Sequence, residues 1–266
     1  MSAASSAFFT HYGPWAVVTG ASSGIGRAIA VELASKGLNT VLVARSRAAL
    51  ETLAEELATR FGVEARAVAA DLGREGALHA VASATRDLDV GLLVAAAGYG
   101  TSGPFLDASP ATERDMLAVN AGAVFDATHH FGNRLARRGR GGVILIGSVV
   151  GFQGTPWSAH YAATKAYVHA LGEALRVEWA PRGIDVLLAA PGPTRSGFSE
   201  RARMTMAAAL DPTDVARATV SALGRRATVL PGSLSKLLGW SLATLPRWAR
   251  VRVMGRVMHR MAGVGA

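Results

Sequence analysis

The stretch Ala16–Gly26, AVVTGASSGIG, decides the fold. It runs from a short apolar segment through a glycine-rich loop into a helical pattern. Glycines permit a tight turn, and they let backbone N–H groups and a helix N-terminus approach a pyrophosphate, whose charge the helix dipole favours. Ser22 and Ser23 add hydroxyl donors. This strand–loop–helix context predicts a dinucleotide site, with an ordinary connecting loop as the alternative.

Outward from this loop, short apolar runs alternate with helical patterns along the chain. The runs are continuous rather than alternating, as in parallel strands that are buried on both faces. Strands are predicted at Ala16–Thr19, Thr40–Ala44, Ala65–Ala70, Leu92–Ala96, Val143–Gly147, Asp185–Ala190 and Thr228–Leu230. Helices are predicted, among other places, at Gly24–Lys36, Ala48–Phe61, Thr112–Ala136 and Tyr161–Trp179. The alternation indicates an α/β fold, a Rossmann-like doubly wound parallel sheet of about seven strands with helices on both faces.

The net charge of +9 lies entirely at the C-terminal end of the chain. All 19 acidic residues fall at or before Asp214, and the part after it holds 9 basic residues and no acid. Residues 1–231 are therefore predicted to form a single Rossmann-type domain, and 232–266 a basic amphipathic extension. Residues 1–214 carry no net charge, and the chain shows no recognised nucleic-acid-binding motif, which argues against nucleic-acid binding. The chain has no cysteine, which excludes disulfides and catalytic thiols.

The end of the second predicted strand bears on the choice of cofactor. NAD binding usually uses an acidic residue there for the ribose hydroxyls. This chain instead reads Val43-Ala44-Arg45-Ser46-Arg47. Arg45 can face a 2′-phosphate with charge-assisted hydrogen bonds, so NADP(H) is preferred over NAD(H). Asp71-Leu72 ends the third strand, where the carboxylate either accepts from an adenine amino group or caps the next helix.

Tyr161 and Lys165 stand four residues apart near the start of a predicted helix. Residues at this spacing share one helix face, so the phenol and the ammonium project into the same region. A phenol has a pKa near 10, and a neighbouring cation favours the phenolate and lowers that pKa. The pair is therefore a candidate for acid–base catalysis, although many helices carry such a pair on a solvated face.

Ser148 and Asn120 are two further candidates. Ser148 follows the fifth predicted strand, where its hydroxyl can hydrogen-bond a carbonyl or alkoxide oxygen beside the phenol. Asn120 lies within a helical stretch, although asparagine is a poor helix former that competes for backbone hydrogen bonds. It is either a surface residue or a holder of water next to Lys165.

Taken in order, these motifs resemble the short-chain dehydrogenase/reductase family over about Pro14 to Leu230. The resemblance implies that Tyr161 is the general acid/base and that Lys165 lowers its pKa and binds the nicotinamide ribose. It also implies that Ser148 orients the substrate oxygen and Asn120 holds a proton-relay water. The implied cofactor-binding residues are Gly20, Ser22, Ser23, Gly24, Ile25, Gly26, Arg45, Asp71, Leu72, Ala97, Gly98, Tyr161, Lys165, Pro191, Gly192 and Thr194.

One departure from the family pattern follows the fourth predicted strand. The family usually reads Asn-Asn-Ala-Gly there, and this chain reads Ala95-Ala96-Ala97-Gly98. Two amides that brace the strands and the adenosine pocket are missing, which puts cofactor affinity and local rigidity in question. A catalytically weak NADP(H)-binding regulator or scaffold is therefore the alternative to an NADP(H)-dependent carbonyl reductase or alcohol dehydrogenase.

Other patterns bear on metals, substrate and partners. His129 and His130 are adjacent and lie on different helix faces, so no metal is expected. Ser148 lacks the Gly-x-Ser-x-Gly context of a hydrolase. The apolar segment 204–210 is expected to be a lid over a lipophilic substrate, or a helix on the core. The resemblance implies a homodimer or homotetramer through the helices that carry Asn120 and Tyr161.

The tail from Pro246 reads as an amphipathic helix. Arg252, Arg256 and Arg260 form one stripe, and an apolar arc lies opposite, made of Trp248, Val251, Met254, Met258 and Met261. Such a helix can lie on an anionic membrane surface, on a partner subunit or on the body. With no signal-peptide pattern at its N-terminus, the protein is expected to be cytoplasmic, with membrane association through this tail as one of the open alternatives.

Overall fold

The computed structural model describes residues 3–202, 204, 209–233, 235–236 and 244–262. Its centre is a seven-stranded sheet in the order β3-β2-β1-β4-β5-β6-β7, with all neighbours parallel. The strands are β1 Trp15–Thr19, β2 Asn39–Ala44, β3 Ala65–Ala69, β4 Val90–Ala95, β5 Gly141–Ile146, β6 Ile184–Ala189 and β7 Thr228–Val229. The predicted fold class is confirmed, and strand bounds differ from the predicted ones by no more than two residues.

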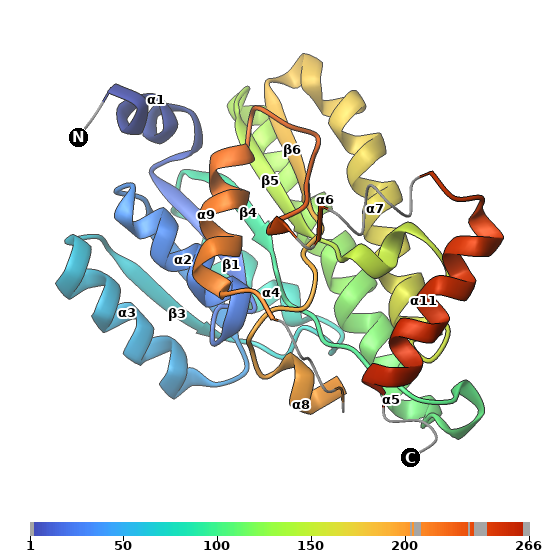
Figure 1. The fold of residues 1–266 in the computed structure, drawn as a ribbon. Coiled ribbons are helices and arrows are strands. Elements are labelled where there is room, and N and C mark those ends of the chain that lie inside the picture. The colour runs from blue at the N-terminus through green and yellow to red at the C-terminus, as the bar shows by residue number, and fades with distance from the viewer. Residues whose placement is uncertain (1–2, 203, 205–208, 234, 237–243, 263–266) are drawn as a thin grey trace.

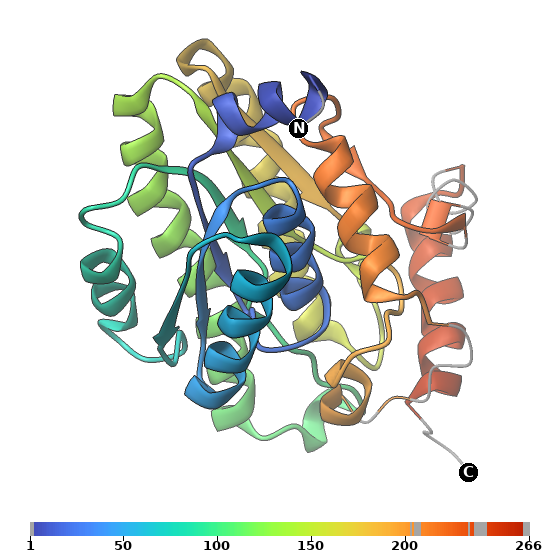
Figure 2. The same ribbon diagram turned by 90° about the vertical axis from the view of Figure 1, so that its left-hand side faces the viewer.

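Helices cover both faces of the sheet (Figures 1 and 2). One buried apolar cluster joins the sheet to α2 Gly24–Ser35, α3 Arg47–Phe61 and α9 Pro212–Ala222. A second cluster on the opposite face joins it to α4 Ala77–Ala84, α6 Ala123–Arg138 and α7 Ala159–Trp179. Strands buried on both faces need apolar side chains at every position, which explains their continuous Val, Leu and Ala runs.

One predicted helix is interrupted in the structure. The expected helix Thr112–Ala136 consists of α5 Pro110–Leu117, a π-helical turn at Ala118–Gly122 and α6. A π turn takes one more residue per hydrogen-bonded ring than an α turn, so it changes which side chains face inward. Asn120 lies at the centre of this turn and is fully buried.

The C-terminal part adds a helix against the body. After the short α8 Phe198–Ala202, the helix α11 Arg247–Met261 lies beside α7 and near the ends of the strands (Figure 1). Met254 and Met258 are buried in a third apolar cluster together with Tyr161. The exposed face carries the arginine stripe of the predicted amphipathic helix. Within the described part of the chain, no helix has the length and apolar character to cross a membrane.

Candidate active site

A cavity of about 440 Å³ opens at the carboxyl ends of the strands. The chain reverses its direction of strand addition between β1 and β4, and open α/β sheets bind ligands at such a switch point. Every predicted catalytic and cofactor-binding residue lines this cavity except Asn120. The sequence motifs, which are far apart along the chain, therefore meet at one edge of the sheet.

The glycine-rich loop between β1 and α2 forms one end of the cavity. Gly20 has a φ of +68°, and a Cβ there would lie 2.9 Å from the backbone of Ala96. At Gly26 a Cβ would lie 2.3 Å from the carbonyl oxygen of Gly20. Ser23 precedes α2 without a side-chain hydrogen bond to the helix. The tight turn thus leaves the N-terminus of a 12-residue helix facing the cavity, which suits a pyrophosphate.

Arg45, Asp71 and Leu72 line the cavity at the ends of β2 and β3. Arg45 is exposed and makes no ion pair with any described residue. Asp71 accepts a hydrogen bond from the N–H of Gly73, and α4 begins only at Ala77 after its N-cap Gly76. The capping alternative for Asp71 is therefore wrong, because a turn separates this residue from the helix.

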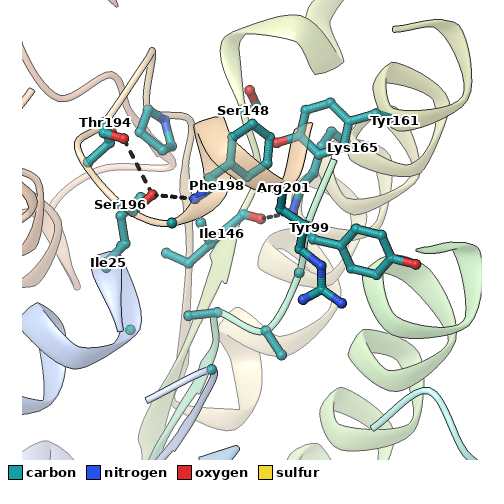
Figure 3. Close-up of a pocket in the computed structure, with 18 of the residues that line it drawn as sticks. Ile25, Tyr99, Ile146, Ser148, Tyr161, Lys165, Thr194, Ser196, Phe198 and Arg201 are labelled. Carbon is teal, nitrogen blue, oxygen red and sulfur yellow. Dashed lines mark hydrogen bonds between the residues drawn. The ribbon is translucent and has the colours of Figure 1, made fainter. Parts of the chain in front are cut away.

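Tyr161, Ser148 and Lys165 meet over the end of β5 (Figure 3). Burial raises the pKa of Tyr161 to about 12, while a hydrogen bond with Ser148 lowers it. The Lys165 ammonium donates to the carbonyl oxygen of Ile146 at 2.9 Å and lies 5.9 Å from the centre of the Tyr161 ring. Burial lowers the pKa of Lys165 to about 8. The sequence argument expected Lys165 to lower the phenol pKa, but burial raises that pKa, and Lys165 is not among the groups that shift it.

Asn120 is the predicted site residue that stands behind the cavity wall. Its amide donates to the carbonyl oxygen of Tyr99 at 2.8 Å and to the hydroxyl of Thr164 at 3.1 Å. Its carbonyl oxygen accepts from the N–H of Tyr99 at 3.0 Å. A Cβ at Gly98 would lie 2.9 Å from this oxygen and 3.4 Å from the Lys165 nitrogen, so Gly98 keeps Asn120 and Lys165 close. The surface alternative for Asn120 is wrong.

Pro191, Gly192 and Thr194 follow β6 and close another side of the cavity. The N–H of Gly192 donates to the hydroxyl of Ser235, and the Thr194 hydroxyl donates to the carbonyl oxygen of Gly192. Thr194 also forms an isolated bridge with Leu210, at the end of the expected lid. The lid residues 205–208 lie outside the described residues, and Met204 lines the cavity.

Sequence reasoning missed most of the remaining wall. Phe198 packs against the Tyr161 ring with centroids 5.3 Å apart, and the Arg201 guanidinium lies 4.3 Å from the centre of the Tyr99 ring (Figure 3). The helix α11 supplies apolar residues, namely Met254, Val257, Met258 and Met261. The methionine arc was visible as one helix face, but nothing in the sequence indicated which surface it covers.

Comparisons with known proteins identify the family of this chain. The family model described as short chain dehydrogenase matches residues 14–207. The chain belongs to the short-chain dehydrogenase family. It is therefore an oxidoreductase of CH–OH groups with the fold that binds NAD(P). The resemblance read from the sequence motifs is confirmed.

Several individual proteins are similar to this short-chain dehydrogenase. It is 33% identical to a 7β-hydroxysteroid dehydrogenase of Clostridium sardiniense over 96% of this chain and 99% of that one. A solved structure from a study of 7β-hydroxysteroid dehydrogenase stereoselectivity has a TM-score of 0.86, with 28% identity over 93% of this chain and 98% of that one. A short-chain dehydrogenase from Sphingobium yanoikuyae in complex with NADPH has a TM-score of 0.77, with 30% identity over 88% and 97% of the two chains.

In this short-chain dehydrogenase a threonine hydroxyl contacts the backbone at the end of β4, where the two family amides are missing. The hydroxyl of Thr19, at the end of β1, accepts from the N–H groups of Ala96 and Ala97 at 3.0 Å. It also lies 3.4 Å from the carbonyl oxygen of Val94, to which it donates. This single buried hydroxyl ties β1 to the end of β4.

No group of three or more histidine, aspartate or glutamate residues is arranged to hold a metal ion among the residues that the structure describes.

Proposed function

We propose that the protein is an NADP(H)-dependent reductase that interconverts a ketone and a secondary alcohol on a bulky lipophilic molecule. The observation that carries the proposal is the buried Tyr161 phenol, which lines a cavity with an apolar outer wall together with Ser148 and Lys165. Catalysis would reside in residues 1–231, and the extension 232–266 would complete the substrate wall.

Each residue around Tyr161 would have its own role in carbonyl reduction. When bound, NADPH supplies the hydride to the carbonyl carbon. Because its pKa is about 12, Tyr161 is protonated at neutral pH and can donate its proton to the substrate oxygen. The Ser148 hydroxyl stabilises the same oxygen as negative charge develops on it. Lys165 would hold the cofactor ribose, and Asn120 would shape the wall beside it through its hydrogen bonds to Tyr99 and Thr164.

The preference for NADP(H) rests on Arg45. Its exposed guanidinium lines the cavity beside Ser46 and makes no ion pair with a described acid, so it is available for a 2′-phosphate. The similar structure from Sphingobium yanoikuyae was solved with NADPH, which supports the same choice.

The proposed substrate class rests on the outer wall. Methionines are flexible and polarizable, so a wall with several of them adapts to a large apolar body. Met254 and Met258 are buried beside Tyr161, and Val257 and Met261 extend the same surface. The similarity to hydroxysteroid dehydrogenases, whose names specify a bulky polycyclic alcohol, supports a substrate of this size.

We further propose that two copies associate through α6 and α7. Large apolar side chains are exposed on these helices, namely Phe125 at 50%, Tyr167 at 41% and Val177 at 76%. Association of two copies through these helices would remove the apolar side chains from water, which is favourable.

Peripheral membrane contact and a cytoplasmic location stay predictions. The buried part of the apolar arc packs on the body, so Trp248, at 63% exposure, and the arginine stripe are what α11 would offer to an anionic bilayer. Co-sedimentation with phosphatidylserine vesicles tests this contact.

The decisive variant is Tyr161→Phe, which removes the proton donor and keeps the ring packing. We expect NADPH binding within about twofold of the parent and a loss of ketone reduction of about 10³-fold or more, within the range for general acid–base catalysis. Tyr167→Phe is the control, because it keeps the ring that the proposed contact between two copies would bury and removes a hydroxyl that lies outside the cavity. Turnover of Tyr161→Phe within a few-fold of the parent would refute the proposal. NADPH binding by the parent without turnover on a broad ketone panel would favour the regulator.

A further inference from the structure

One face of α7 carries three side chains that all reach the end of β5. Tyr161, Lys165 and His169 follow at intervals of four residues, which places them one above another on a helix. Tyr161 lines the cavity together with Ser148, and the Lys165 ammonium donates to the carbonyl oxygen of Ile146. The third member, His169, has no role in the steps above.

We propose that His169 is a positioning residue that fixes the backbone of Ser148, so that the serine hydroxyl stays aimed at Tyr161 and the substrate oxygen. The proposal rests on the function proposed above. The backbone N–H of Ser148 donates to Nε2 of His169 at 3.3 Å. His169 is 5% exposed and does not line the cavity, so it acts through Ser148 rather than on the reaction itself.

The surrounding backbone leaves room for this imidazole. A Cβ at Gly147 would lie 2.4 Å from Nε2 of His169, and a Cβ at Gly151 would lie 2.9 Å from the same atom. The ring also packs edge-on against Phe152, with centroids 4.5 Å apart. Glycines on both sides of Ser148 therefore let the loop close around the imidazole, which fixes the ring plane and the direction of its hydrogen bond.

The protonation state of His169 suits an acceptor. A nitrogen that accepts from a backbone N–H carries no proton, so the proton of the neutral ring is on Nδ1. Burial, with a smaller effect of the Lys165 charge, lowers the pKa of His169 to about 4. The ring is therefore neutral near pH 7, and the Ser148 N–H keeps its acceptor.

The consequence for catalysis is one of geometry. The N–H of Val150 also bonds to the Ser148 hydroxyl at 3.4 Å, so the turn after β5 is held at both its backbone and its side chain. Loss of the His169 acceptor leaves a buried N–H unpaired, and the turn relaxes to satisfy it. A displacement of about 1 Å at a catalytic group can cost on the order of 10²-fold in rate.

The test is a double-mutant cycle with Ser148. His169→Leu removes the acceptor, and we expect kcat for ketone reduction to fall about 10- to 100-fold with the Kd for NADPH unchanged. In a Ser148→Ala background, where the positioned hydroxyl is gone, the same change should lower kcat less than twofold. An effect of His169→Leu that is equally large in both backgrounds would overturn the proposal, because it would act through general damage.

Two amide variants separate hydrogen bonding from packing. His169→Gln can present its amide oxygen near the position of Nε2, so it should recover most of kcat. His169→Asn carries the same amide on a shorter side chain and should not recover kcat. The two amide variants also test the proposal if the leucine variant fails to fold. Equal rates for the two amide variants would overturn the proposal. His79→Leu, at an exposed position of α4, is the control for histidine loss.

Failure of the positioning role and failure of the proposed function give different results. If Ser148→Ala and Tyr161→Phe both reduce ketones at the parent rate, the proposed function fails, and the positioning role falls with it. If those two variants are inactive and His169→Leu keeps the parent kcat, only the positioning role fails.

Discussion

At the scale of single residues, burial of the Lys165 ammonium lowers the stability of the folded state, although the proposed function needs this group. Its pKa falls to about 8 because burial penalises the charge, whereas the unfolded chain keeps the ordinary value of 10.5. Below pH 8 the ammonium is charged in both states, and folding bears the full burial penalty. Between pH 8 and 10.5 the folded state loses the proton first, so the penalty fades as pH rises.

This sign gives a prediction for Lys165→Met. At pH 7 the variant should melt roughly 2–5 °C above the parent, and the gain should shrink at pH 10, while ketone reduction is lost. Thermal unfolding without cofactor at both pH values measures this. Lys236→Met, at an exposed lysine, should show no gain at either pH. A lower melting temperature for Lys165→Met at pH 7 would mean that the bond to Ile146 outweighs the penalty.

The role of Arg45 is also decided at one residue. Arg45→Asp places a carboxylate where the 2′-phosphate would lie, so the ratio of kcat/KM for NADPH to that for NADH should fall roughly 10- to 100-fold. The matched control is Arg47→Asp, which makes the same charge change on an exposed residue that does not line the cavity. Equal shifts in the two variants would remove Arg45 from the cofactor site.

The positions of some site residues could be predicted from the sequence, because glycine-dependent turns and the periodicity of apolar residues determine them. The glycine loop, Ser148, Tyr161 and Lys165 follow strand ends and helix periodicity, so they could be assigned to one edge of the sheet. Asp71 could not, because a carboxylate at a strand end satisfies several short-range geometries equally well. His169 looked like one of several scattered histidines, since its partner Ser148 is 21 residues away.

At the scale of elements, α11 is the part whose position the sequence left open. An amphipathic pattern states that one face is covered but not by what. In the structure the apolar face of α11 packs on the body and forms part of the cavity wall, where Met254 and Met258 are buried. Likewise, the π turn at Ala118–Gly122 has no periodic signature, because the helices on both sides keep their own patterns.

Because α11 lines the outer wall of the cavity, we expect its side chains to affect KM for bulky substrates. Met258→Ala should raise KM for a bulky ketone about 10-fold and leave the Kd for NADPH unchanged, because the lost contacts belong to the outer wall. Kinetics with one bulky and one small ketone measure the effect, which should be absent for the small one. Arg256→Ala, on the exposed face, is the control. An equal rise in KM for both ketones would place Met258 outside the substrate wall.

At the scale of the whole molecule, the exposed apolar residues of α6 and α7 predict assembly. The parent should elute as a dimer or tetramer, and Phe125→Glu should shift the mass towards the monomer, because it buries a charge at the proposed contact. Size-exclusion chromatography with light scattering measures the mass. Leu106→Glu, at a residue that is 94% exposed outside these helices, should keep the parent mass. A monomeric parent would refute the assembly.

The basic face of α11 has a practical consequence for handling the protein. Five of the nine basic residues after Asp214 lie on this helix, which also walls the cavity. A negatively charged resin would therefore adsorb the molecule through α11, whose opposite face lines the outer wall of the cavity. Such an immobilised preparation should be poorly active on large ketones, and high salt should release it. Tethering through the N-terminal helix α1 Ala3–Tyr12, which lies away from α11 in Figure 1, would leave α11 facing the solution.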